Sequence, residues 1–291
     1  MWFGTCTYTM PTQTHRDYWA NQWSDRVLER QIASGHKKAW WPILVDLVQS
    51  LRDEDLIVEA GCGMGQYVYL IKKMGKRIIG VDVIDQAISK TKTLYPELPL
   101  MLQDVRCLAL ADNVVELMIS LGVVEHFERG PDEALAEAAR VVRPGGRLFI
   151  AVPFSNWYRR FREPVRRVKR RMIGQKGQSF YQYTFGQGWF CKKLEQYGFR
   201  LEKSLLHHSH VALKKDLPWL VRLPIPTKER LSEAKAYKLW GRLFDWISPQ
   251  LMSHMMLVVA IRSENTGAAS RYIASRQADS GDIMIESEIT R

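Results

Sequence analysis

The chain has 291 residues, of which 46% are hydrophobic and 25% charged, and its formal net charge is +11. This composition is typical of a globular protein that buries a sizeable core. The four cysteines form no C-x-x-C pair, which excludes a thioredoxin-like motif and gives no indication of zinc. The N-terminus lacks the pattern of a secretory signal, and the apolar run from Met255 to Ile261 is too short to span a bilayer. We therefore expect a cytoplasmic protein.

The expected elements alternate between strands and helices. Strands are predicted at residues 56–60, 77–82, 100–102, 115–121 and 147–152. Between them the pattern predicts a turn at 144–146 and helices at 65–74, 85–94 (with Asp85 as the N-cap) and 131–142. A helix at 189–197, closed by Gly198, precedes strands at 199–206 and 255–261. This order predicts an α/β fold, Rossmann-like and doubly wound, with a mainly parallel sheet.

Two stretches interrupt this order and act as inserts. Residues 155–180 follow the fifth strand, and residues 211–254 separate the last two strands. We expect one domain over residues 51–262 that carries both inserts. Residues 1–50 are expected to form a helical lid, and residues 263–291 a flexible tail.

The strongest motif is Glu59-Ala60-Gly61-Cys62-Gly63-Met64-Gly65, which follows a strand and opens a helix. Glycines at these positions let the backbone turn tightly and approach a ligand closely. The helix N-terminus beyond them attracts a negative group, such as a cofactor carboxylate. Gln66 stands where a dinucleotide fingerprint starting at Gly61 needs glycine or alanine, which argues against NAD.

Acidic residues follow the next two strands. Asp82 ends the second strand, where a carboxylate can accept hydrogen bonds from both ribose hydroxyls, and Val83 and Ile84 give an apolar wall for adenine. Asp104, after the third strand, can accept a hydrogen bond from the adenine amino group. The alternative for both acids is a role in a cap or turn. Residues 122–127 follow the fourth strand and belong to the same edge of the sheet.

In these motifs the sequence resembles the class I S-adenosylmethionine-dependent methyltransferases, in the type 11 subgroup related to the ubiquinone-biosynthesis enzymes. The matching segments are EAGCGMG at 59–65, GVD at 80–82, QDV at 103–105, ISLGVVEHF at 119–127 and RPGGRLFIAVP at 143–153. The resemblance is dense from about residue 56 to 153 and resumes weakly at 183–203. Residues 113–116 depart slightly from the pattern that usually precedes the fourth strand.

The resemblance implies a seven-stranded sheet whose last strand is antiparallel, with S-adenosyl-L-methionine as cofactor and no metal. It also implies the cofactor contacts. The methionine end would lie against Glu59 and the loop of Gly61, Cys62, Gly63 and Gly65, completed by Leu121 and Gly122; the ribose and adenine would lie against Asp82, Val83, Asp104 and Val105.

Further side chains have two interpretations each. His126 is the candidate general base, because imidazole titrates near neutral pH, or it shapes the pocket. Glu125 beside it is interpreted as structural. The histidines at 207, 208 and 210 face the substrate or, as the weaker alternative, bind a metal. The aromatic residues at 18, 19 and 23 close over the cofactor or simply pack.

The first insert holds most of the charge. Residues 157–176 contain nine basic residues and one acid, a charge of +8. An apolar stripe with helical spacing lies among them, made of Trp157, Phe161, Val165, Val168 and Met172. A basic amphipathic helix favours an anionic membrane surface, and the alternative is that the stripe packs on the domain. The second insert shows a weaker stripe of Trp240, Leu243, Ile247 and Leu251, with the same alternative.

Three functions follow. The first is methyl transfer to a small-molecule or lipid-like acceptor, in the cytoplasm or as a peripheral protein at the membrane face. The second is an RNA or DNA methyltransferase that uses the basic insert on phosphates. The residues after the fourth strand lack the Asn/Asp-Pro-Pro-aromatic motif of many base-amino methyltransferases, which argues against nucleic acid. The third is a non-catalytic cofactor-binding protein, which the intact glycine loop disfavours.

Overall fold

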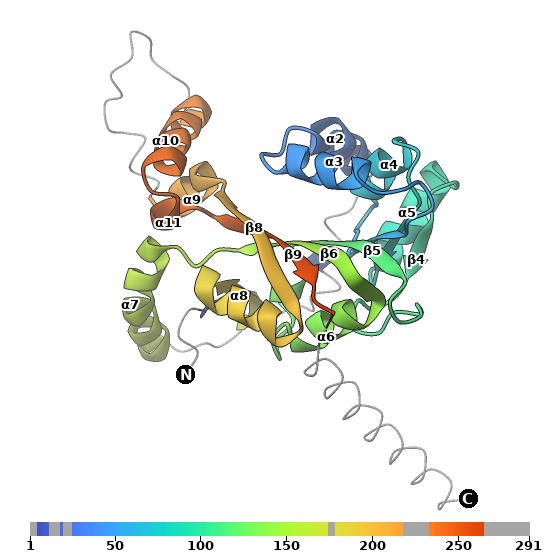
Figure 1. Ribbon diagram of the computed structural model, residues 1–291. Helices are drawn as coiled ribbons and strands as arrows, with labels where there is room; N and C mark the ends of the chain where they lie inside the picture. Colours follow the sequence, from blue (N-terminus) through green and yellow to red (C-terminus); the bar gives the residue numbers. More distant parts are fainter. Residues whose placement is uncertain (1–4, 12–17, 20–24, 174–177, 218–232, 265–291) are drawn as a thin grey trace, which may run out of the picture.

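A seven-stranded mixed sheet forms the centre of the molecule (Figure 1). The computed structural model describes residues 5–11, 18–19, 25–173, 178–217 and 233–264. The strand order is β4-β3-β2-β5-β6-β9-β8. The bounds are β2 (Ile57–Ala60), β3 (Ile78–Asp82), β4 (Leu100–Leu102), β5 (Val115–Leu121), β6 (Val142–Pro153), β8 (Phe199–His207) and β9 (Met255–Arg262). Strands β2 to β6 are parallel, and β9 runs antiparallel to both β6 and β8, which confirms the predicted fold class.

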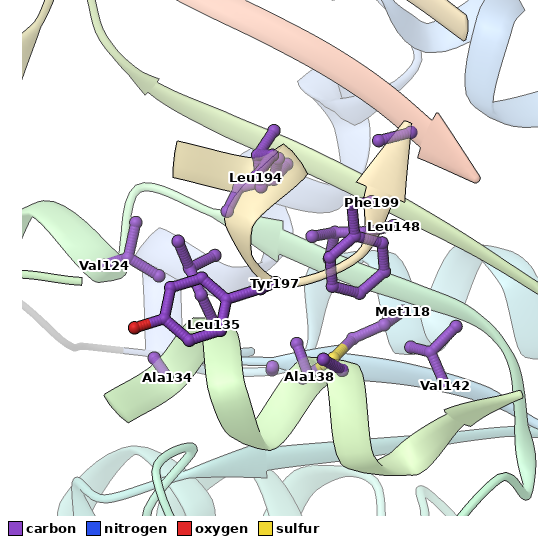
Figure 2. Packing of buried hydrophobic residues seen from close by; sticks show 14 of the residues in the cluster. Met118, Val124, Ala134, Leu135, Ala138, Val142, Leu148, Leu194, Tyr197 and Phe199 are labelled. Carbon is purple, nitrogen blue, oxygen red and sulfur yellow. The ribbon is translucent and has the colours of Figure 1, made fainter. Parts of the chain in front are cut away.

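Helices cover both faces of the sheet, so the central strands are buried on both sides. One face carries α3 (Trp41–Gln49) and α4 (Gln66–Lys72), with α5 (Asp85–Leu94) beside them and α2 (Asp25–Gly35) outside α4. The other face carries α6 (Asp132–Val141) and α8 (Gln187–Gln196). Figure 2 shows Ala138 of α6 beside Met118 of the sheet, where its small side chain lets the helix lie close.

Two local predictions were wrong. Asp85 is the first residue of α5 and not its N-cap, which is Ile84; the preceding turn is fixed instead by Asp82, whose Oδ1 accepts the Ile84 N–H at 2.9 Å. The predicted turn at residues 144–146 lies inside β6. There β6 carries extra residues relative to β5, because Val115 pairs with Val142 while Leu117 pairs with Arg147. The glycines of the predicted turn lie in this irregular segment, where Gly145 adopts a positive φ of 78°.

A second, two-stranded sheet was not predicted. Strand β1 (Thr5–Pro11) pairs antiparallel with β7 (Gln178–Phe185), and Thr7 lies opposite Tyr183. The N-terminal 50 residues are therefore not a purely helical lid, because β1 precedes α2 and α3. An isolated bridge between Phe154 and Phe185 connects β7 to the end of β6.

The two inserts form helices at one end of the sheet (Figure 1). The first contains α7 (Trp157–Ile173), as its spacing predicted. The second begins within α9 (Ser209–Asp216) and also contains α10 (Glu233–Ile247) and α11 (Pro249–Met252). None of the helices in the described ranges is long and apolar enough to cross a membrane. The predicted flexible tail lies almost entirely outside the described residues.

Candidate functional site

A cavity of about 430 Å³ lies at the C-terminal ends of strands β2 to β5. This is the edge where open parallel sheets bind ligands, and the volume is in the range of small-molecule sites. Ten of the eleven cofactor residues expected from the sequence line it, namely Glu59, Gly61, Cys62, Gly63, Asp82, Val83, Asp104, Val105, Leu121 and Gly122. His126 also lines it. Residues that lie up to 67 positions apart in the chain are thus brought to one cavity.

The glycine loop is shaped by its backbone. Gly61 has a φ of 78°, and a Cβ atom built on it would meet Val123 Cγ2 at 2.3 Å. A side chain there would be strained and would also enter the wall of the cavity. Gly65, the eleventh expected residue, does not line the cavity. It is the N-cap of α4 at a φ of 78°, and a Cβ on it would lie 3.0 Å from Leu100 Cδ2.

We expect Gly61→Ala to weaken binding of S-adenosylhomocysteine by about 1–3 kcal/mol, because the added Cβ would lie 2.3 Å from Val123 Cγ2 and the cavity wall would have to shift. Gly75→Ala is the matched control, because Gly75 has a φ of +81° but nothing within 4 Å of its added Cβ. The control should lose stability and keep its affinity. Titration calorimetry on both variants measures the difference, and equal affinities would show that the loop does not contact the ligand.

Asp82 fixes the loop as well as lining the cavity. Its Oδ2 accepts a hydrogen bond from the Gly63 N–H at 2.7 Å, while its Oδ1 accepts the Ile84 N–H. Burial raises the pKa of this carboxyl, against the two backbone hydrogen bonds and a third from Val83, which lower it. The role in a turn and the role in the cavity are therefore compatible, because each carboxylate oxygen can accept more than one hydrogen bond.

Asp82→Ala is expected to weaken S-adenosylhomocysteine binding by about 1.5–3 kcal/mol, since hydrogen bonds to a charged group and the support of the loop are lost together. Asp85→Ala, an exposed acid three residues further on, is the matched control and should bind normally. Unchanged calorimetric affinity of the Asp82 variant would remove this carboxylate from the cofactor site.

Glu59 is a buried carboxyl in the floor of the cavity. Only 4% of its surface is exposed, and its Oε2 accepts the Val68 N–H of α4 at 3.1 Å. Burial raises its pKa to about 8; the Val68 hydrogen bond opposes the rise, and the nearby charge of Asp82 adds to it. An acidic group held neutral inside a cavity is suited to a cationic ligand group, which would let it ionise.

Asp104 is less available than the sequence suggests. Arg106 binds it through both guanidinium and backbone, with Nη2 at 2.6 Å from Oδ2 and the amide N at 2.9 Å from Oδ1. The Arg106 guanidinium also lies 4.9 Å from the centre of the Phe127 ring. Asp104 thus has the turn role that was the alternative prediction, and it also lines the cavity.

Aromatic rings surround His126, which ends the short helix η1 (Val124–His126). The rings of Trp19 and Tyr181 lie edge-on to it, at 5.5 and 5.1 Å between centroids. His126 Nδ1 is 2.9 Å from the Tyr181 carbonyl oxygen. Because a carbonyl can only accept, Nδ1 carries the hydrogen in the neutral ring and the lone pair lies on Nε2. Tyr18 packs against Tyr181, whereas Trp23 lies outside the described residues.

Glu125 is buried beside the histidine. Its Oε1 is 3.9 Å from His126 Nε2, and only 2% of the residue is exposed. Burial raises the pKa of Glu125 to about 8. The sequence analysis interpreted Glu125 as structural. It did not predict that a buried, neutral carboxyl lies next to the candidate base.

Sequence reasoning did not assign several lining residues to the cofactor site, namely Gln31, Gln66, Tyr67, Arg106 and Val123. Gln66 and Tyr67 follow the glycine loop directly, so the first turn of α4 was the available signal. Gln31 is on α2, which reaches the cavity only through tertiary packing. Nothing in the local sequence of α2 indicates this position.

The histidine cluster at the end of β8 lies outside the cavity lining. Burial lowers the pKa of His207 to about 3 and that of His208 to about 4, and the neighbouring positive groups, Lys38 among them, add to both shifts. In the described part of the chain, no three or more His, Cys, Asp or Glu side chains are grouped so that they could hold a metal ion. The predicted role of these histidines toward a substrate remains a prediction.

Comparison with known proteins agrees with this geometry. Residues 58–150 match the family model of a methyltransferase domain. The chain contains a class I S-adenosylmethionine-dependent methyltransferase domain. The cofactor of this domain class is S-adenosylmethionine, and the cavity fits it, because it combines buried carboxyls with a glycine loop that a Cβ would obstruct.

The relatives share only part of their length with this chain. A probable S-adenosylmethionine-dependent methyltransferase of Mycolicibacterium smegmatis is 31% identical over 99 residues, which are 33% of this chain and 37% of that protein. A tRNA (carboxymethyluridine(34)-5-O)-methyltransferase of Mus musculus is 27% identical over 114 residues, 38% of this chain and 17% of that protein. The matched segments therefore span only 37% and 17% of the lengths of these two relatives.

Solved structures share the fold of the methyltransferase domain. Geranyl diphosphate C-methyltransferase from Streptomyces coelicolor A3(2) has a TM-score of 0.53 and 15% identity, over 85% of this chain and 96% of that one. A methyltransferase from Methanosarcina mazei has a TM-score of 0.53 and 14% identity, over 77% of this chain and 98% of that one. At these identities the similarity concerns the fold.

Proposed function

We propose that the protein transfers a methyl group from S-adenosylmethionine to a small-molecule or lipid-like acceptor at the cytoplasmic face of a membrane. The observation that carries the methyl transfer is the convergence of Glu59, Asp82 and the glycine loop on one cavity that also holds His126. When bound, the cofactor supplies a methyl group on a positively charged sulfur, which is already electrophilic. The acceptor would gain this methyl group, and the electron pair of the broken carbon–sulfur bond would stay on the sulfur.

The residues of the chain would hold the reactants and receive a proton. Glu59 and the loop around Gly61 would position the methionine end, and Asp82 the ribose. His126 Nε2, which carries the lone pair, would take the proton that the acceptor loses. Glu125, 3.9 Å away, would then ionise more readily beside the new imidazolium and stabilise it.

Two observations support a small or lipid-like acceptor. The wall next to His126 is aromatic, with Trp19 and Phe127 in the cavity lining and Tyr181 against the histidine ring. Such a wall favours apolar parts of an acceptor. Helix α7 of the first insert also exposes apolar side chains, such as Phe161 and Met172. The alternative acceptor is tRNA, on which one of the relatives acts.

The experiment is to incubate the protein with S-adenosylmethionine that is tritiated in the methyl group. Three acceptor pools are supplied separately: a total lipid extract, a lipid-free metabolite extract and total tRNA. We expect label in the lipid or the metabolite pool, and much less of it with Asp82→Ala when the cofactor concentration is below saturation. Label in tRNA alone would overturn the proposed acceptor, and label in no pool would count against the proposed activity.

A further inference from the structure

Helix α7 packs on the protein through its polar side. Arg159 is 3% exposed, and its Nε donates to Asp216 Oδ2 of α9 at 2.8 Å. The Nη2 of the same guanidinium is 2.9 Å from His254 Nδ1. Glu163, one turn further along, is also buried. An arginine and a glutamate thus occupy the positions where a surface helix normally buries apolar residues.

The opposite side of α7 is apolar and exposed to solvent. The exposed fractions of its stripe are 51% for Trp157, 78% for Phe161, 70% for Val165, 57% for Val168 and 81% for Met172. At 100° per residue these five positions lie within one narrow sector, away from Arg159 and Glu163. The alternative that the stripe packs on the domain is therefore wrong for this helix.

The second insert repeats this arrangement in part. On α10, Trp240 packs into the cluster around Leu213, Tyr237 and Met252, as does Leu251 of α11. Leu243 and Ile247 are exposed, so the predicted second stripe is divided between the interior and the surface. Together with Leu239 and Trp246, these exposed residues keep helical spacing, so α10 presents a second, shorter apolar surface.

Positive charge flanks the α7 stripe. Arg160 and Arg162 are exposed, and helical spacing places them on opposite edges of the stripe. Arg162 also donates a hydrogen bond from Nη1 to the Tyr158 hydroxyl at 3.0 Å, so binding to a headgroup would share or replace this contact. The sequence from 157 to 176 carries a charge of +8; the side chains beyond Val165 that contribute to this charge lie outside the described part of the chain. Apolar residues edged by arginines suit a boundary between acyl chains and anionic headgroups, because the long basic side chains can reach outward while the stripe inserts.

We propose that α7 binds the surface of an anionic lipid bilayer, with its apolar stripe inserted and its basic residues at the headgroups. Only the purpose of this binding, which is to deliver an acceptor from the bilayer to the cavity, rests on the proposed function. Strand β7 begins five residues after α7, and the Tyr181 carbonyl of β7 contacts His126. RNA would satisfy the arginines but would leave the valines and the methionine of the stripe in water, so the exposed stripe favours a bilayer.

The test is cosedimentation of the full chain with phosphatidylcholine vesicles, with and without phosphatidylglycerol, at low salt. We expect retention that depends on phosphatidylglycerol. Phe161→Ala combined with Met172→Ala should weaken the retention about tenfold or more, because two large side chains no longer leave water. Both side chains are more than three-quarters exposed, so their truncation should leave the fold intact.

Two controls make the result specific. Leu94→Ala combined with Val114→Ala removes exposed apolar side chains elsewhere and should leave the retention unchanged. Lys90→Gln combined with Lys92→Gln removes two exposed charges of α5 and should matter less than Arg160→Gln combined with Arg162→Gln.

The proposal is overturned if wild-type protein stays in solution, if the Phe161/Met172 variant is retained as well as wild type, or if total tRNA displaces the protein from vesicles at an equal charge ratio. Calorimetry with S-adenosylhomocysteine on the same preparation keeps this result apart from the proposed function. Binding of S-adenosylhomocysteine without vesicle retention would reject the docking surface alone, whereas retention without cofactor binding would reject the methyltransferase activity alone.

Discussion

His126→Ala is expected to lower the rate of methyl transfer about a hundredfold, the usual contribution of a positioned general base, while S-adenosylhomocysteine binds almost as tightly as before. The reason is the geometry of the ring, because Nδ1 donates to the Tyr181 carbonyl and leaves Nε2 as the basic atom. The rate is measured with tritiated cofactor and whichever of the three acceptor pools takes up label.

His126→Asn separates the two interpretations of this residue. The asparagine amide can still donate a hydrogen bond to the Tyr181 carbonyl, but it has no basic nitrogen. If His126 is the base, the asparagine variant should be as slow as the alanine variant. Turnover near the wild-type rate in His126→Asn would instead mean that the histidine only shapes the wall of the cavity.

Cofactor affinity is expected to rise with pH, about tenfold per unit, from about pH 6 until it levels off near pH 8. The physical cause is Glu59. In the ligand-free protein its pKa is about 8, so at lower pH the carboxyl is neutral and must lose its proton to bind the cationic end of the cofactor. Calorimetry with S-adenosylhomocysteine in a series of buffers measures this dependence.

Glu59→Gln is the control for this pH dependence. The glutamine can keep the hydrogen bond from Val68 but cannot ionise, so its affinity should be low and nearly independent of pH. The pH dependence of this variant also distinguishes Glu59 from Glu125. Glu125 has a similarly raised pKa and is intact in the variant, so any pH dependence that it causes would remain. A wild-type affinity that does not change over this range would show that Glu59 does not contact a charged part of the cofactor.

The same raised pKa bears on stability. The unfolded chain ionises Glu59 near pH 4.5, whereas the folded protein does so only near pH 8. Glu59 therefore contributes fully to the stability of the folded state below about pH 4.5. This contribution is lost as the pH rises through the folded-state pKa of about 8. In the ligand-free protein, Glu59→Gln should reduce the fall in melting temperature between about pH 6 and pH 8.

The central sheet was predictable because its signals are local. Each parallel strand is a short apolar run, and the glycine loop and the acids stand at strand ends, where the topology brings them together. The sequence did not reveal which neighbouring side chains contact these glycines and acids. Gly65 packs against Leu100, and Asp104 is held by Arg106, and both interactions depend on side-chain contacts that spacing alone does not specify.

Which side of α7 faces the protein could not be predicted from the sequence either, for a related reason. Periodicity identifies the apolar side of a helix, but it does not say whether that side meets the protein or the solvent. Here the answer is given by the pairing of Arg159 with Asp216, a residue 57 positions further along the chain. A charged pair on the polar side thus determines which side of the helix is buried.

The pairing of β1 with β7 has a consequence for how the protein folds during synthesis. The partner of Thr5 is Phe185, so β1 leaves the ribosome long before the strand that it pairs with. Contacts between such distant segments form late, because closing a long loop costs conformational entropy. The parallel strands β2 to β5 lie within residues 57–121, so this part of the sheet can assemble first, together with most of the cofactor residues at its edge. The aromatic wall around His126, which needs Tyr181 of β7, is then among the last parts of the site to form, so a nascent chain would acquire its cofactor cavity before its acceptor wall.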